Sequence, residues 1–318
     1  MARADLLLDL VEAERRGDRT RFRGIVEAVI AEERANQHHL LADRLSELIV
    51  STGQSAIRDD HAAAMRDLLH EVVPDRRLVD LELAKVPQRV VTELIEEHQR
   101  ADLLRSYGIE PRHRLLLSGP PGNGKTSVAE AIAAELMLPF YVIRYEGVVS
   151  SFLGETAARI DSAFEFARTR RCVLFFDELD TIAKERSDQH ETGEIKRVVS
   201  TLLLQIDRLP SHVIFVGATN HEELLDRAAW RRFQIHAKLE TPNRAQAARF
   251  LEKLASRFGG DLGFAPRTLA EKLVGASFAE LEEFAMDVRR RAVLELPDAN
   301  LRRIARERFE NRHSRETS

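Results

Sequence analysis

Cysteine is nearly absent from this sequence, which has one thiol, Cys172, among 318 residues. A single thiol cannot form an internal disulfide, so the sequence excludes a disulfide-stabilised secreted scaffold and fits a reducing compartment. Cys172 begins the apolar run CVLFF, which favours a buried thiol without a reactive role. The N-terminus lacks the pattern of a secretory signal, and no run of about 18 apolar residues is present. We therefore expect a soluble cytoplasmic protein without a membrane span.

An excess of basic residues is also missing. The sequence has 48 lysine and arginine residues against 52 aspartate and glutamate residues, and its pI is near 6.3. A surface that neutralises nucleic-acid phosphates needs a strong positive charge. Only the C-terminal stretch LRRIARERFENRHSR is conspicuously basic. The composition therefore argues against nucleic acid as the main partner.

The length and the hydrophobic pattern predict three parts. A chain of 318 residues exceeds the roughly 100 to 200 residues that are typical of one domain. Residues 1–75 are expected to form a small helical module and a linker, because apolar residues recur there at helical spacing. The clearest apolar face is formed by Phe22, Ile25, Val26, Val29 and Ile30.

Residues 76–240 alternate between strand patterns and helix patterns. The strands are predicted in LVDLEL, HRLLLSG, PFYVIRY, RCVLFFDELD and HVIFVGATN, and helices over residues 87–107, 155–169 and 194–208. Such alternation predicts an α/β fold in which helices cover both faces of a mostly parallel sheet, with the ligand at the carboxyl ends of the strands. Residues 241–318 show helical patterns alone, over residues 243–258, 267–274, 277–296 and 299–313, which predicts a separate small helical domain.

A glycine-rich segment follows the predicted strand at residues 115–117. Gly119, Gly124, Lys125 and Thr126 match the pattern G-x-x-x-x-G-K-[ST], in which backbone N–H groups surround phosphates, the lysine reaches the terminal phosphates and the hydroxyl holds Mg²⁺. The positive end of the following helix faces the same anion. We therefore predict that the segment binds a phosphate-bearing ligand with Mg²⁺. The predicted binding residues are Gly119, Pro120, Pro121, Gly122, Asn123, Gly124, Lys125 and Thr126.

Two acids end the apolar strand at residues 173–176. Asp177 and Glu178 are expected to lie beside the phosphate loop, because the carboxyl ends of parallel strands share one edge of the sheet. There Asp177 is predicted to hold Mg²⁺ with Thr126, partly through water, and Glu178 to orient and deprotonate the attacking water. The alternative is that these acids only terminate a strand.

Over residues 76–297 the chain resembles the AAA family of ATPases, in the manner of a small bacterial member. The matching segments are GPPGNGKT, LFFDELD, GATN and LLDRAAWRRF. The resemblance implies a P-loop NTPase sheet sandwiched by helices with a C-terminal helical lid domain, ATP hydrolysis to ADP and phosphate, and a homo-oligomeric ring, commonly a hexamer. It also implies that Asn220 senses the terminal phosphate and the attacking water.

The same resemblance implies that Arg231 and Arg232 reach the ATP of a neighbouring subunit. A guanidinium from another chain stabilises the charge that develops on the transferred phosphate, so hydrolysis would require assembly. The alternative is that both arginines are solvated surface charges.

The segment SSFLGETAARI resembles a loop that faces the central pore in many protein-remodelling members. Phe152, Leu153 and Gly154 match its aromatic, aliphatic and glycine positions. The resemblance implies that Phe152 offers a flat apolar surface to a threaded polypeptide. The alternative is a phenylalanine that packs into the core of its own subunit.

Other parts of the chain depart from the family pattern. In SFAELEEF, Phe278 stands for a glycine and Glu280 for an aspartate, and no arginine is assigned to a small-domain sensor position. The N-terminal helices resemble those of small bacterial AAA proteins that are suspected to work beside a subtilisin-like protease. This resemblance implies a protein client or adaptor bound by the N-terminal helices, and a protease as a candidate partner.

Three classes of function fit these features. The first is a ring-forming ATPase that remodels a protein client, which the acidic pI, Phe152 and the helical N-terminal module favour. The second is a nucleic-acid motor or loader, which would require basic pore loops or a DNA-binding module. The third is a nucleotide-gated regulatory partner of a separate enzyme, such as a protease or a toxin. Stimulation of ATP hydrolysis by unfolded protein or by DNA would distinguish them.

Overall fold

The computed structural model describes residues 25–26, 29, 69–143, 153–180, 193–225 and 227–316. The chain divides into two compact units, Met1–Ala64 and Met65–Ser318. In the first unit Ile25, Val26 and Val29 are helical, and Val26 and Val29 are buried, which agrees with the predicted apolar face. The other predicted N-terminal helices lie outside the described residues. The predicted domain boundaries at residues 75 and 240 stay predictions.

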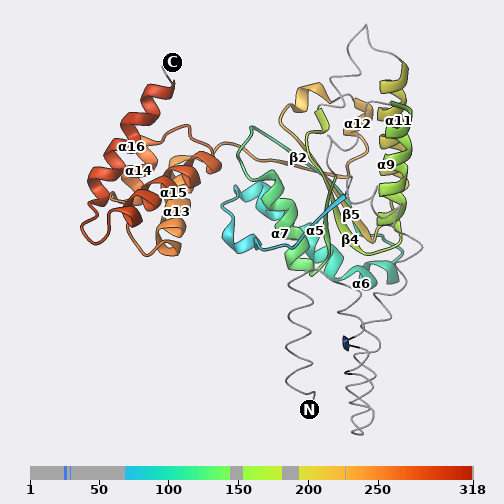
Figure 1. Cartoon of the computed structure of the whole chain (residues 1–318). Helices are drawn as coiled ribbons and strands as arrows, with labels where there is room; N and C mark the ends of the chain where they lie inside the picture. The colour runs from blue at the N-terminus through green and yellow to red at the C-terminus, as the bar shows by residue number, and fades with distance from the viewer. Residues whose placement is uncertain are drawn as a thin grey trace. The chain divides into compact units, whose positions relative to one another are not determined.

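A six-stranded sheet lies in the second unit, with the strand order β1-β3-β4-β5-β2-β6 (Figure 1). Its strands are β1 (Leu69–Val72), β2 (Arg114–Ser118), β3 (Phe140–Ile143), β4 (Cys172–Phe176), β5 (Val213–Thr219) and β6 (Ile235–Lys238). The edge strand β1 pairs antiparallel with β3, and the other four pairings are parallel. The predicted parallel-dominated α/β sheet is therefore confirmed. Ser118 pairs with Thr219 and Phe176 with Gly217, so β2, β4 and β5 end at the same edge.

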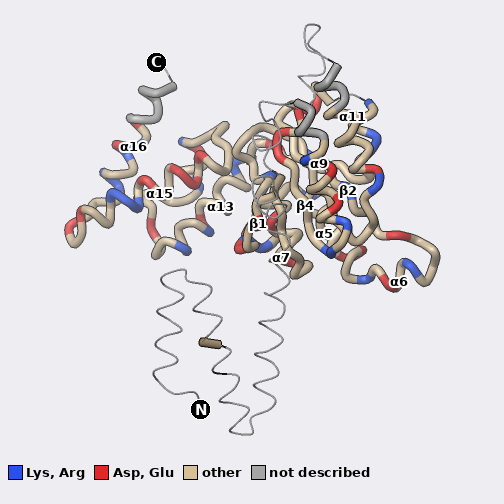
Figure 2. Tube along the Cα trace, turned by 45° about the vertical axis from the view of Figure 1, so that its right-hand side comes forward, with Lys and Arg blue, Asp and Glu red and all other residues tan. Residues whose placement is uncertain are grey.

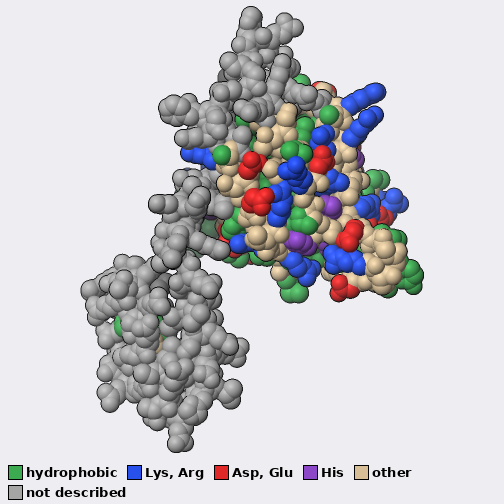
Figure 3. Space-filling view, turned by 90° about the vertical axis from the view of Figure 1, so that its right-hand side faces the viewer, with side chains coloured by type: hydrophobic (Ala, Val, Ile, Leu, Met, Phe, Trp, Pro, Cys, Tyr) green, Lys and Arg blue, Asp and Glu red, His purple; other side chains and the backbone are tan. Residues whose placement is uncertain are grey.

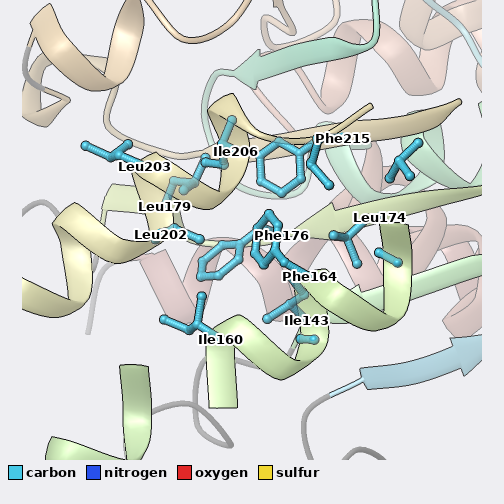
Figure 4. Packing of buried hydrophobic residues seen from close by; sticks show 14 of the residues in the cluster. Ile143, Ile160, Phe164, Leu174, Phe176, Leu179, Leu202, Leu203, Ile206 and Phe215 are labelled. Atoms are coloured by element: carbon cyan, nitrogen blue, oxygen red, sulfur yellow. The ribbon is translucent and has the colours of Figure 1, made fainter. Parts of the chain in front are cut away.

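Helices cover both faces of the sheet. The helices of this part are α5 (Lys85–Gln99), α6 (Ala101–Ser106), α7 (Lys125–Leu136), α9 (Leu153–Arg168), α11 (Gly193–Asp207) and α12 (Arg227–Trp230). Alternate strand residues enter two buried clusters, because successive side chains of a strand point to opposite faces. Leu174 and Phe176 of β4 pack with α9 and α11 (Figure 4), whereas Val173 and Phe175 pack with α5 and α7.

The C-terminal part is helical, as predicted. Its helices are α13 (Arg244–Arg257), α14 (Pro266–Lys272), α15 (Phe278–Leu294) and α16 (Leu301–Glu316), and their apolar residues form a third buried cluster. Ser277 caps α15, and the Glu280 carboxylate accepts a hydrogen bond from the Ser277 amide at 2.7 Å. Glu280, which stands at the family's aspartate position, is therefore the third residue of α15 and completes its N-terminal capping box. Among the described residues, no helix is long and apolar enough to cross a membrane.

Three details of the sequence prediction were wrong. The segment LVDLEL is not a strand but contains the 3₁₀ helix η1 (Leu78–Asp80). The Glu135 carboxylate of α7 accepts the Leu78 N–H, and the Asp80 and Leu81 N–H groups donate to carbonyl groups of the same turn, so these groups do not pair with a strand. Strands β1 and β6 were not predicted. The single helix expected over residues 87–107 is divided into α5 and α6 at Arg100.

Candidate active site

The phosphate-loop sequence connects the end of β2 to the start of α7. Gly124 is the N-cap of α7 and has φ +84°, so the chain enters the helix through a left-handed turn. Gly119 has φ +137°, and a Cβ atom there would lie 2.0 Å from the carbonyl oxygen of Leu239. The loop therefore requires glycine at position 119, both for its backbone angle and for the close approach of the chain that follows β6.

A cavity of about 330 Å³ lies beside this loop. It is lined by the loop and by side chains that follow β4 and β5, and also by residues before α5 and from the C-terminal helices. Of the predicted site residues, Pro121, Gly122, Asn123, Gly124, Lys125, Thr126, Asp177, Glu178 and Asn220 line the cavity. The fold thus brings together predicted site residues from three separate segments of the chain. Gly119 and Pro120 contact Lys125 instead.

Lys125 is the buried cation of this cavity, with 7% of its surface exposed. Its Nζ atom donates hydrogen bonds to the carbonyl oxygens of Gly119 at 2.7 Å and Pro120 at 3.1 Å. Burial lowers the pKa of Lys125 below its ordinary value, and the nearby carboxylates of Asp177 and Asp180 partly oppose that effect. A phosphate group in the cavity would favour the charged form of this amine. The site therefore fits an anion.

Thr126, Asp177 and Glu178 present oxygen atoms to the same cavity. A threonine hydroxyl and an aspartate carboxylate are oxygen ligands of the kind that Mg²⁺ takes together with phosphate and water. No group of three or more histidine, cysteine, aspartate or glutamate residues is placed to hold a metal within the described part of the chain. These residues fit a Mg²⁺ ion that takes its other ligands from a nucleotide and from water.

Glu178 has an uncommon backbone conformation. Its φ is +53°, in the left-handed region that side chains other than glycine rarely adopt, and its amide donates to Oδ1 of Asp177 at 2.9 Å. Strained residues of this kind are concentrated at functional sites. The turn presents an exposed Glu178 carboxylate to the cavity directly after the fully buried strand β4.

Asp180 is a site residue that the sequence prediction missed. It is 4% exposed, and its Oδ1 accepts hydrogen bonds from Oγ1 of Thr219 at 2.9 Å and from the Asn220 amide at 3.2 Å. Asn220 is thereby fixed at the end of β5, and its own Oδ1 atom is buried beside the cavity without a hydrogen-bond partner in the described part of the chain. An unpaired buried oxygen at this place fits a bound water or ligand. Asp180 is the last residue of the DELD segment, and this second aspartate was the feature of the sequence that could have identified it as a site residue.

The C-terminal helices supply the other wall of the cavity. The Ala279 amide donates to the Gly122 carbonyl at 2.9 Å, so the start of α15 contacts the phosphate loop directly. Phe278, which replaces the family glycine, packs edge-to-face against Phe250 with ring centroids 5.0 Å apart. Both rings line the cavity together with Leu81 and Leu83. These apolar residues offer a surface that suits a planar base, and the sequence analysis did not identify them.

The two predicted arginines are not among the residues that line this cavity. Arg231 and Arg232 follow α12 and do not line it; Arg231 is exposed, whereas Arg232 forms an ion pair with Asp207. Their predicted action on the ATP of a neighbour stays a prediction. Phe152 lies outside the described residues, and Leu153 and Gly154 begin α9.

Cys172 is fully buried, as predicted, and burial raises the pKa of its thiol to about 12.

Comparison with known proteins identifies similar sequences. The sequence model of the family described as "ATPase family associated with various cellular activities (AAA)" matches residues 115–241. An uncharacterized AAA family ATPase from Sinorhizobium fredii is 36% identical over 94% of this chain and 94% of its own length. A putative 26S proteasome regulatory subunit homolog from Methanothermobacter marburgensis is 32% identical over 69% of this chain, and a cell division cycle protein 48 homolog from Archaeoglobus fulgidus is 33% identical over 86%. The chain spans 59% and 38% of the lengths of these last two relatives.

The sheet, the phosphate loop and the helical C-terminal part define a phosphate-loop ATPase with an α/β core. Within that class, the chain belongs to the AAA family of ATPases. It is therefore an enzyme that binds ATP and hydrolyses it.

Proposed function

We propose that this protein is a ring-forming ATPase that uses Mg²⁺ and ATP to remodel a protein client in the cytoplasm. The use of ATP in this proposal is supported by one observation. Lys125, Asp177, Glu178 and Asn220, which come from three segments of the chain, line the same cavity. Such convergence supplies a cation for phosphate, a carboxylate for Mg²⁺, a base and a polar sensor in one place.

The roles follow from the position of each group. Lys125 and the free N–H groups at the start of α7 bind the phosphates, and Thr126 and Asp177 hold Mg²⁺. The bound Mg²⁺ would neutralise charge on the phosphate oxygens. Glu178 accepts a proton from the attacking water, and Asn220, held by Asp180, orients that water or the terminal phosphate. Arg231 or Arg232 of a neighbouring subunit completes the site.

A protein client suits the charge distribution better than nucleic acid does. Basic and acidic side chains are interspersed on the face that Figure 3 views, and both occur along α15 in Figure 2. The similarity to a putative 26S proteasome regulatory subunit homolog also supports a role toward proteins. The predicted pore loop of Phe152, Leu153 and Gly154 would grip the client, and the N-terminal unit would recruit it or an adaptor.

Replacement of Phe152 tests the remodelling part of the proposal. Phe152→Ala should leave basal ATP hydrolysis within a few-fold and abolish its stimulation by an unfolded protein, whereas Phe152→Tyr should keep stimulation because an aromatic face remains. Thermal melting of each variant controls for a phenylalanine in the core, whose loss would lower stability by about 3 to 5 kcal/mol. Normal stimulation of Phe152→Ala at an unchanged melting temperature would contradict a role of Phe152 in gripping the client, and absence of stimulation in the wild type would favour a regulatory partner that threads nothing.

Ring formation is tested by dilution. If a neighbour completes each site, the specific ATPase activity should fall as the protein is diluted, in step with the loss of oligomers in light scattering. A monomer with full specific activity would contradict the proposal.

A further inference from the structure

The two consecutive arginines after α12 have opposite environments. Arg232 is 27% exposed, and its guanidinium has three acceptors within its own subunit. Nε donates to the Leu203 carbonyl at 3.2 Å and lies 3.0 Å from Oδ2 of Asp207, while Nη1 donates to the Ala228 carbonyl at 2.6 Å. Arg231 is exposed, and its side chain contacts no acceptor among the residues that the structure describes.

The acceptors of Arg232 belong to a firmly anchored helix. Leu203 and Ile206 of α11 are buried in the cluster that Figure 4 shows, so the Leu203 carbonyl and the last residue of the helix, Asp207, have fixed positions. An acid at the carboxyl end of a helix is unfavourable beside the helix dipole unless cations compensate it. Two cations do so here, because Oδ1 of Asp207 also accepts a hydrogen bond from Arg114 at 3.2 Å.

The residues on both sides of Arg231 are held as well. Trp230 stacks on His236 of β6, with ring centroids 4.0 Å apart, and buried Phe233 stacks on Phe215 of β5 at 5.9 Å. Arg231 therefore projects from a short segment whose neighbours are fixed to the sheet and to α11. A group presented in this way loses little conformational freedom when a second subunit binds it.

We propose that Arg231 alone reaches the ATP of a neighbouring subunit, and that Arg232 is a positioning residue that Asp207 holds inside its own subunit. This inference rests on the proposed ring-forming ATPase. To reach another chain, the Arg232 guanidinium would have to leave one carboxylate and two carbonyl groups, and Asp207 would lose one of its two cations. Arg231 has no such contacts to break among the described residues.

Variants of the full chain separate the two roles. Arg231→Ala should lower kcat for ATP hydrolysis by about 10³-fold or more, the loss typical of a missing arginine finger, with KM and the melting temperature unchanged. Arg232→Ala and Asp207→Asn should each lower kcat by about 10 to 10²-fold through a misplaced Arg231. Their double variant should be about as active as the single variants, because both substitutions remove the same ion pair between Arg232 and Asp207. Arg208→Ala, an exposed arginine beside Asp207, is the control and should behave as wild type.

The effect of Asp207→Asn on kcat depends on which arginine reaches the neighbour's ATP. If Arg231 does so, kcat should fall. If Arg232 were itself the finger, releasing it from Asp207 would leave kcat unchanged or raise it, and Arg232→Ala would be as inactive as Arg231→Ala. That pair of results would overturn the inference. Mixing Arg231→Ala with Glu178→Gln subunits should restore turnover, because an intact site then meets an intact Arg231. Full activity of Arg231→Ala and Arg232→Ala alike, with no effect of dilution, would instead refute the ring-forming ATPase itself.

Discussion

Removal of the Asp180 carboxylate should destabilise the unit that contains the active site. Its Oδ1 atom is the acceptor for the Thr219 hydroxyl, which is 1% exposed, and for the Asn220 amide. In Asp180→Ala both donors lose this acceptor where water has little access, and each unpaired buried donor costs about 1 to 3 kcal/mol. The free energy of unfolding should therefore fall by about 2 to 6 kcal/mol. Asp180→Asn keeps an acceptor oxygen, so its free energy of unfolding should fall by only about 1 kcal/mol.

Urea unfolding followed by tryptophan fluorescence measures this difference. Trp230 is the single tryptophan of the sequence and is stacked on His236 in the same unit, so its emission reports the unfolding of this part. Asp102→Ala, which removes an exposed acid on α6, is the matched control and should not shift the transition. The reasoning is refuted if Asp180→Ala unfolds at the same urea concentration as this control.

Further predictions concern pH, the phosphate loop and the thiol. Burial holds the pKa of His98 and His113 below their ordinary value of about 6.5, so protonation favours the unfolded chain. The free energy of unfolding should be insensitive to these groups above about pH 7 and should fall as the pH drops below about 6.5; equal urea midpoints at about pH 7.5 and 5.5 would contradict this. Gly119→Ala should weaken ATP binding, because its Cβ would lie 2.0 Å from the Leu239 carbonyl; wild-type affinity in a fluorescent-nucleotide titration would disprove it. Cys172 should react with maleimide only after unfolding, since it is 0% exposed, and fast labelling of the native protein would count against this burial.

The sequence predicted the central strands and the helices of the second unit more reliably than its short elements. Strands β2, β4 and β5 come from apolar runs that are almost wholly buried, and such runs are recognisable without a partner. Strand β6 is only four residues long, so its alternation of apolar and polar residues is too short to be distinctive. It becomes a strand through pairing with β2, which a local pattern cannot reveal. The alternation of LVDLEL was misleading because this segment pairs with no strand; its Leu78 N–H donates to the Glu135 carboxylate of α7 instead.

The candidate site was predictable where a motif fixes both residue type and spacing. Lys125, Asp177, Glu178 and Asn220 were named from such motifs, and the structure places them in one cavity. Their roles in ATP chemistry stay predictions. The sequence could not show that Asp180 is buried against Thr219, because that contact joins two segments only in the folded chain. For the same reason the pairing of Arg232 with Asp207, which distinguishes it from Arg231, appears only in three dimensions.

The central claim is that Glu178 activates water in a site whose phosphates Lys125 binds. The most direct test measures ATP binding and steady-state phosphate release on the same preparations of Glu178→Gln and Lys125→Ala. Glu178→Gln should bind ATP as the wild type does and lose turnover, because the glutamate acts on water and the amide cannot accept its proton. Lys125→Ala should lose binding, because the lysine contacts phosphate before any reaction. Phosphate release by Glu178→Gln at the wild-type rate would contradict the account.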